Sequence, residues 1–144
     1  MKTAAILAIA FIGLALLSAT PSVEAKKLPN LVANITVTTT NATNGSNGTA
    51  VVTVTLFNNG TKQAKRSVLE VYLKGPLDDV DSRERSIDHR TKAIRKGRHR
   101  MFSWTFDNLQ AGSYEGKVIL DVNERVKESD EEDNTIPFVV VVGK

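Results

Sequence analysis

The chain has 144 residues, a formal net charge of +3 and no cysteine. The absence of cysteine excludes disulfide cross-links, thiol catalysis, iron–sulfur clusters and cysteine-based zinc sites. The length suits one domain of ordinary size, and such a domain buries enough apolar surface to fold without a covalent cross-link.

Residues 1–25 have the pattern of a secretory signal peptide. Lys2 supplies the positive start, and the apolar run Ala4–Leu17 is shorter than the about 20 residues that cross a bilayer. Small residues place the predicted cleavage before Lys26; the alternative is an uncleaved membrane anchor. No second hydrophobic span follows. We therefore expect a secreted, extracellular domain over residues 26–144, with no membrane span after processing.

Three segments in the first half of this domain alternate apolar and polar residues, as half-buried β-strands do. They are Leu31–Val37, Ala50–Phe57 and Val68–Lys74. A turn is predicted at Asn58–Thr61, because Asn and Gly tolerate a positive φ. Gly75–Pro76 ends the third strand, since proline cannot donate to a sheet. The side chains expected to point inward are Leu31, Ala33, Ile35, Val37, Val52, Val54, Leu56, Leu69, Val71 and Leu73.

The next stretch, Arg83–Arg100, is rich in Lys and Arg, against only Glu84 and Asp88. Arginine forks suit sulfate and phosphate, so this basic segment is a candidate site for a sulfated glycan or another polyanion. The alternative is a solvated loop or edge strand, and a seventh strand is expected between Asp81 and Ile94. No aromatics are interleaved for base stacking, so nucleic acid is not expected. The candidate polyanion-binding residues are Arg90, Lys92, Arg95, Lys96, Arg98 and Arg100.

Catalytic signals are missing from the sequence. The 2 histidines, His89 and His99, lie among cations, which disfavours a cation site there. Ser86, Asp88 and His89 could be drawn as a hydrolytic triad, but no nucleophile elbow or oxyanion-hole motif accompanies them. We assign no catalytic residue and do not expect an enzyme.

The last third of the chain predicts further strands at Phe102–Phe106, Tyr114–Val122 and Phe138–Val142. The last of these is apolar on both faces, as in a central strand or one covered on its outer side. Trp104 and Tyr114 are expected in the core, with the tyrosine hydroxyl bonded to nearby backbone as in a tyrosine corner. Short strands and polar turns predict an all-β sandwich of two sheets, with seven strands in all.

A dense acidic turn separates the last two strands. Ca²⁺ takes clustered carboxylate and carbonyl oxygens, so calcium is the one cofactor considered. The spacing fits no EF-hand loop, and the alternative is a structural turn whose Asp and Asn side chains bond local backbone. The candidate metal ligands are Asp121, Glu128, Asp130, Glu131 and Asp133.

Several asparagines begin Asn-x-Ser/Thr sequons, which accept glycans in a secreted chain if the host has the machinery. The alternative is an Asn/Thr-rich tract that forms turns. The residues are Asn34, Asn41, Asn44, Asn47 and Asn59.

Several segments, in order, resemble the CARDB family, the cell-adhesion-related domain of bacterial and archaeal surface proteins. Leu28–Val32 is similar to the family's opening P-D-L segment, and Val52–Thr61 to its v-t-v-x-N-x-G strand and turn. Phe102-Ser103-Trp104 resembles the aromatic strand, and Ala111–Tyr114 followed by Asp121 resembles the p-G-x-Y … v-D segment.

The most specific similarity is that of Val126–Thr135 to the family's v-x-E-s-n-E-x-N-N hairpin. There are two departures: Asp133 replaces the first Asn of the usual pair, and Leu77–Arg98 is longer and more basic than expected. The resemblance implies an immunoglobulin-like or fibronectin-III-like sandwich that serves surface interaction or cell adhesion. The expected partner is an extracellular protein or glycan. Polyanion binding and a calcium-stabilised adhesion domain are the alternatives, and the oligomeric state stays open.

Overall fold

The computed structural model describes residues 27–43, 46–79 and 82–144. The expected signal peptide and its cleavage site lie outside these residues, as does the sequon at Asn44. The described chain forms strands β1 (Leu31–Thr40), β2 (Gly48–Asn58), β3 (Val68–Gly75), β4 (Arg83–Arg90), β5 (His99–Leu109), β6 (Gly112–Ile119) and β7 (Thr135–Val142). None of the described residues is helical, so this part of the chain has no helix that could cross a membrane.

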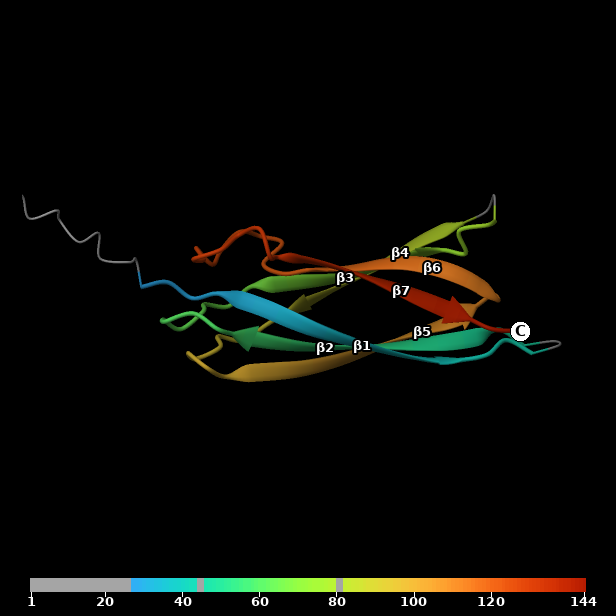
Figure 1. Cartoon of the computed structure of the whole chain (residues 1–144), viewed down its shortest axis with the longest axis horizontal. Helices are drawn as coiled ribbons and strands as arrows, with labels where there is room; N and C mark the ends of the chain where they lie inside the picture. The colour runs from blue at the N-terminus through green and yellow to red at the C-terminus, as the bar shows by residue number, and fades with distance from the viewer. Residues whose placement is uncertain (1–26, 44–45, 80–81) are drawn as a thin grey trace, which may run out of the picture.

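The strands form two antiparallel sheets that pack face to face (Figure 1). One sheet has the order β1-β2-β5 and the other the order β4-β3-β6-β7. This confirms the predicted immunoglobulin-like β-sandwich. β4 is the strand expected between Asp81 and Ile94.

The core lies between the sheets and consists of the side chains that the alternation points inward. Val52, Val54, Leu69 and Val71 are completely buried. From β1, only Leu31 is buried to the same degree, and the other inward residues of that strand pack partly buried against the cluster. Aliphatic burial contributes about 25 cal/mol per Å², and with no cysteine in the chain this burial takes the place of a covalent cross-link.

Two predictions about the last strands are wrong. β6 ends at Ile119 and the chain turns at Asp121, which has a φ of 45°, so Val122 is 43% exposed rather than inward. β7 lies at the edge of its sheet. Its outer residues Val139 and Val141 are 65% and 60% exposed. Branched side chains favour extended backbone even where nothing covers them, so an apolar run on both faces does not by itself indicate a central strand.

The aromatic row on β5 lies at the open side of the sandwich, because β4 and β5 are edge strands of opposite sheets. Phe106 is buried, whereas Phe102 and Trp104 are half-buried with ring centroids 5.9 Å apart. His89 on β4 packs against both rings, 4.5 Å from Phe102 and 5.7 Å from Trp104. His89 is therefore a packing residue at the joint between the sheets.

Tyr114 forms the predicted tyrosine corner. Its ring is buried, and its hydroxyl donates a hydrogen bond to the carbonyl oxygen of Gln110 at 2.9 Å. Burial raises the pKa of this phenol. The bond fixes the connection between β5 and β6.

The turn after β2 holds the start of the domain. The buried Asn58 side chain accepts hydrogen bonds from the backbone nitrogens of Asn30 and Gly60, both at 3.1 Å. It also donates to the carbonyl oxygens of Lys62 and Ile94 at 2.7 and 2.9 Å. Gly60 does not have a positive φ, so the reason predicted for this turn is wrong. A Cβ there would lie 2.3 Å from the Asn30 nitrogen, and close backbone contact is what requires glycine.

Candidate functional site

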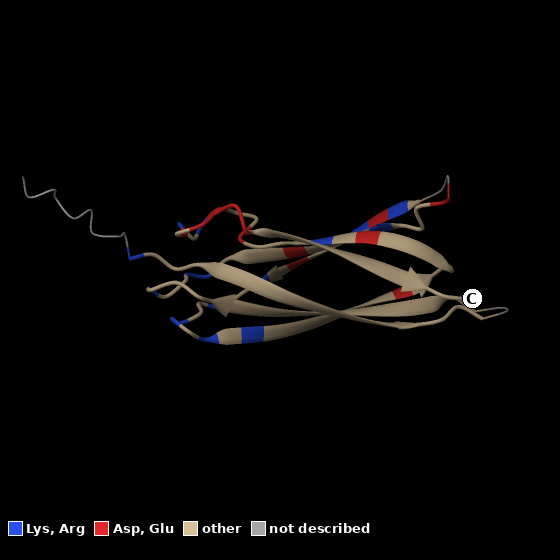
Figure 2. Cartoon of the chain, in the orientation of Figure 1, with Lys and Arg blue, Asp and Glu red and all other residues tan. Residues whose placement is uncertain are grey.

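Cations gather at the end of the sandwich opposite the C-terminus, where the acidic part of the β6–β7 connection also lies (Figure 2). This cationic end is formed by the β2–β3 connection (59–67), the β4–β5 connection (91–98), the adjoining strand ends, and one arginine of the β6–β7 connection (120–134). Its exposed cations are Lys62, Lys65, Arg66, Arg90, Lys92, Arg95, Lys96, Arg98, Arg100 and Arg125. In the described part of the chain, none of them lies within ion-pairing distance of a carboxylate.

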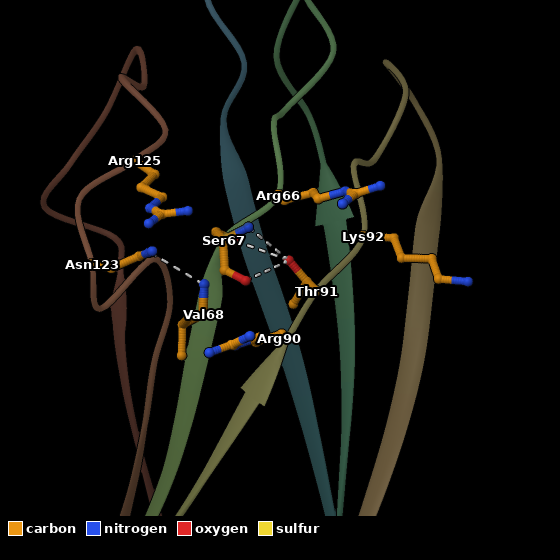
Figure 3. Close-up of a pocket in the computed structure, with 8 residues that line it drawn as sticks. All are labelled: Arg66, Ser67, Val68, Arg90, Thr91, Lys92, Asn123 and Arg125. Atoms are coloured by element: carbon orange, nitrogen blue, oxygen red, sulfur yellow. Dashed lines mark hydrogen bonds between the residues drawn. The ribbon is translucent and has the colours of Figure 1, made fainter.

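The three connections are fastened together beneath these cations (Figure 3). The buried hydroxyls of Ser67 and Thr91 are 2.9 Å apart, and the Thr91 backbone nitrogen donates to the Ser67 carbonyl at 2.8 Å. Val68 donates its backbone N–H to the Asn123 side-chain oxygen at 3.3 Å and accepts from the Val122 nitrogen at 2.9 Å. These bonds hold in place the backbone beneath the cations. We call Ser67, Val68, Thr91 and Asn123 the floor of the site.

Two hollows lie among the cations, and only the first lies over these bonded residues. The first, of about 500 Å³, is lined by the floor residues and by Arg66, Arg90, Lys92 and Arg125. Figure 3 shows Arg125 beside Asn123, Arg90 below Ser67 with its guanidinium directed toward Val68, and Arg66 and Lys92 on the Thr91 side. The second hollow, of about 670 Å³, shares Arg66 and Lys92 and adds Arg95, Arg98 and Arg100. No carboxylate lines either hollow.

All the predicted polyanion-binding residues lie at the cationic end, although Lys96 lines neither hollow. The basic segment as a whole is split, however. Arg83 and Arg85 start β4, roughly 20 Å of extended chain away from Arg90. The Arg85 guanidinium donates a hydrogen bond to the Asp107 carbonyl oxygen instead.

Sequence reasoning missed Arg66 and Arg125, because both lie far from the basic segment in the chain. A signal for Arg66 was present. The Lys65–Arg66 pair directly precedes β3, and antiparallel pairing of β3 with β4 brings Val68 opposite Arg90. Arg125 lies in an acidic stretch, and the net negative charge of that stretch gives no indication of a basic site.

The acidic loop, residues 128–133, is hydrogen-bonded to the start of the domain. The buried Glu128 carboxylate accepts hydrogen bonds from the Leu31 backbone nitrogen and from the Asn134 side chain, the latter at 2.8 Å. Asp133 accepts from the Asn30 side-chain nitrogen at 3.1 Å. These contacts support the structural interpretation of the turn.

Burial chiefly, with the charges of Glu131 and Asp121, raises the pKa of Glu128 to about 7, against the two hydrogen bonds that lower it. Burial also raises the pKa of Asp121. One of its carboxylate oxygens accepts from the Val126 nitrogen at 2.7 Å, and the other has no hydrogen-bond partner in the described chain.

The candidate metal ligands do not assemble into a metal centre. Within residues 27–43, 46–79 and 82–144, no group of three or more His, Cys, Asp or Glu could hold a metal ion. Glu131 accepts from the Glu128 nitrogen at 2.8 Å, and Asp130 from the Glu132 nitrogen at 2.9 Å. The carboxylates are thus used to hold backbone rather than aimed at one point.

The drawn triad is also absent from the described structure. Ser86 and Asp88 are exposed on the outer face of β4, whereas His89 faces the aromatic row. Successive strand residues point to opposite faces, so these three side chains do not converge.

The described sequon asparagines are all exposed: Asn34, Asn41, Asn47 and Asn59. Their glycosylation stays a prediction.

The two-sheet fold defines the chain as an immunoglobulin-like β-sandwich. The CARDB family model matches residues 28–137, and the chain belongs to the CARDB family. CARDB domains are non-catalytic β-sandwich modules of surface proteins. No curated protein matches the sequence.

Among solved structures, the CARDB domain of the PF1109 protein from Pyrococcus furiosus, in complex with di-metal ions, has a TM-score of 0.63 at 19% identity. The match covers 81% of this chain and 96% of that one. The solution structure of the same domain gives 0.61 at 19% identity, over 81% and 97%. β-Glucosidase 3B from Thermotoga neapolitana, in complex with α-D-glucose, gives 0.53 at 17% identity, over 81% of this chain but only 16% of the enzyme. At these identities the likeness shows the fold alone.

Proposed function

We propose that this CARDB domain is a secreted, extracellular and non-enzymatic interaction module whose cationic end binds an anionic glycan. The observation that carries the proposal is the pair of hollows lined by arginine and lysine without any carboxylate. Charges that serve only solubility are commonly interspersed with opposite charges, whereas these cations come from separate connections and face the same hollows.

The chemistry of the cations favours sulfate-bearing ligands. A guanidinium presents a planar fork that pairs with two oxygens of a sulfate or carboxylate at once. A cluster of unpaired cations also raises the local concentration of anions and speeds their association. His99 is the only aromatic residue that lines either hollow, so stacking of nucleic-acid bases has little support.

The residues at the floor favour binding over catalysis. The Ser67 and Thr91 hydroxyls are buried and bonded to each other. Neither a histidine nor a carboxylate lines the first hollow, so these hydroxyls have no general base beside them.

Heparin-affinity chromatography with a salt gradient tests the proposal. We expect the wild-type protein to be retained, and the triple variant Arg95→Ala, Lys96→Ala, Arg98→Ala to elute at markedly lower salt, because screening removes what remains of the attraction. The matched control removes the same charge elsewhere, with Lys74→Ala, Arg83→Ala and Lys117→Ala. Lack of retention of the wild type, or equal losses in the two triples, would contradict the proposal.

A further inference from the structure

Arg66 occupies a special position at the cationic end. It lines the first hollow, the second hollow, and a third, shallower one that also includes Lys65 and Arg125. It is the only residue common to all three. An arginine shared in this way can contact anionic groups on either side of it.

The backbone at Arg66 is held in place between the hollows. The next residue, Ser67, is buried and tied to Thr91 through both its hydroxyl and its carbonyl oxygen. Figure 3 shows Arg66 extending from beside Ser67 toward Lys92, whereas Arg125 lies beside Asn123 on the opposite side of Ser67. The guanidinium is exposed while its backbone is fixed.

The two main hollows open toward different sheets. The first is bordered by Asn123 and Arg125, which follow β6 of the four-stranded sheet. The second is bordered by His99 and Arg100, which begin β5 of the three-stranded sheet. Packed sheets lie about 10 Å apart, so one sulfate group does not reach both hollows.

We propose that the hollows form one track with Arg66 at its middle, and that the ligand is a linear glycan with repeated sulfate groups that occupies both sides at once. The proposal rests on the proposed function and specifies its ligand. A chain that spans the track gains a second contact that is effectively intramolecular, so its affinity exceeds that of a short fragment.

Isothermal titration calorimetry with heparin-derived di-, tetra-, hexa- and octasaccharides tests this directly. We expect the wild-type affinity to rise at least ~10-fold from the disaccharide to the octasaccharide, as linkage of two contacts predicts. Arg66→Ala lowers the octasaccharide affinity by a larger factor than the disaccharide affinity, and so removes most of this gain. Arg125→Ala, which alters the first hollow but not the second, reduces the octasaccharide gain as well.

Arg83→Ala is the matched control, since this exposed arginine lies at the opposite end of β4, and its affinities should equal those of the wild type. Circular-dichroism melting curves confirm that each variant is folded. Equal wild-type affinity for the disaccharide and the octasaccharide would overturn the track. The track would also be overturned if the affinity still rose with oligosaccharide length, as in the wild type, in both Arg66→Ala and Arg125→Ala.

Two further arms separate the possible outcomes. Inorganic polyphosphate of matched length should bind less tightly than the octasaccharide, and tighter binding would overturn the choice of a glycan. Unsulfated hyaluronan fragments should bind more weakly still, because they lack sulfate, and binding equal to heparin would overturn the sulfate requirement. If no sulfated glycan binds at any length, the proposed function itself fails, whereas binding without length dependence defeats only the track.

Discussion

Glu128 shows how a single carboxylate couples the acidic loop to the first strand. Its pKa is raised from 4.5 to about 7, chiefly by burial. A folded-state pKa above the unfolded one means that the folded protein binds the extra proton. The free energy of unfolding is therefore highest below the unfolded pKa, and it falls as the pH rises from about 4.5 to about 7.

We accordingly expect the free energy of unfolding to fall by on the order of 2–3 kcal/mol between about pH 5 and pH 8. Asp121, whose pKa is also raised by burial, contributes a change of the same sign as the pH rises above its ordinary pKa. Urea denaturation at each pH measures the change. A stability that is constant or rises across this range contradicts the account.

The neutral variant Glu128→Gln isolates this effect. Its oxygen still accepts from the Leu31 nitrogen, and its new amide faces the Asn134 side chain, which must turn to present its oxygen, an atom without a partner in the described chain. We expect the variant to flatten most of the pH dependence with the fold intact. An unchanged slope would assign the titration to another group.

Individual residues differ in how far their roles could be predicted. The corner formed by Tyr114 follows from a short segment of chain, since its partner is only 4 residues away. The burial of Glu128 depends on a contact with Leu31 across 97 residues. A glutamate inside an acidic run carries no local sign of such burial, and the same holds for the packing of His89 against the aromatic row.

At the scale of elements, the pairing of β6 with β7 depends on a glycine. Gly116 lies opposite Phe138, and a Cβ at this position would be 2.3 Å from the phenylalanine ring. We expect Gly116→Ala to lower the free energy of unfolding by ~1–3 kcal/mol through overpacking. Glu115→Ala, at an exposed position opposite Val139, serves as the control and should stay within about 0.5 kcal/mol. Equal losses of unfolding free energy in the two variants, measured by urea denaturation, would show that the Phe138 ring moves aside without cost and would contradict this expectation.

The strands themselves were predictable because alternation of side chains is a local property. Their positions in the sheets were not, because these depend on which strands pair. Pro137 was the available signal for β7: proline is confined to edge strands, and β7 is an edge strand with Val139 and Val141 exposed. The apolar run Phe138–Val142 favoured a central strand instead.

For the whole molecule, the site is a product of topology. The cations Arg66, Lys92 and Arg125 belong to three connections, and they meet because antiparallel strands return those connections to one end of the sandwich. Sequence alone indicated the half of the site that lies in the basic segment. The other half required the pairing of β3 with β4 and the contact of Val68 with Asn123.

A titration of the ¹⁵N-labelled protein with heparin octasaccharide, followed by two-dimensional NMR, tests most directly that this end binds the ligand. The account predicts the largest amide shifts in the connections 59–67 and 91–98 and around Arg125, with the β4 start and the outer faces of both sheets unaffected. Shifts centred on the outer face of β7 or on the opposite end, or no shifts at saturating ligand, would contradict it.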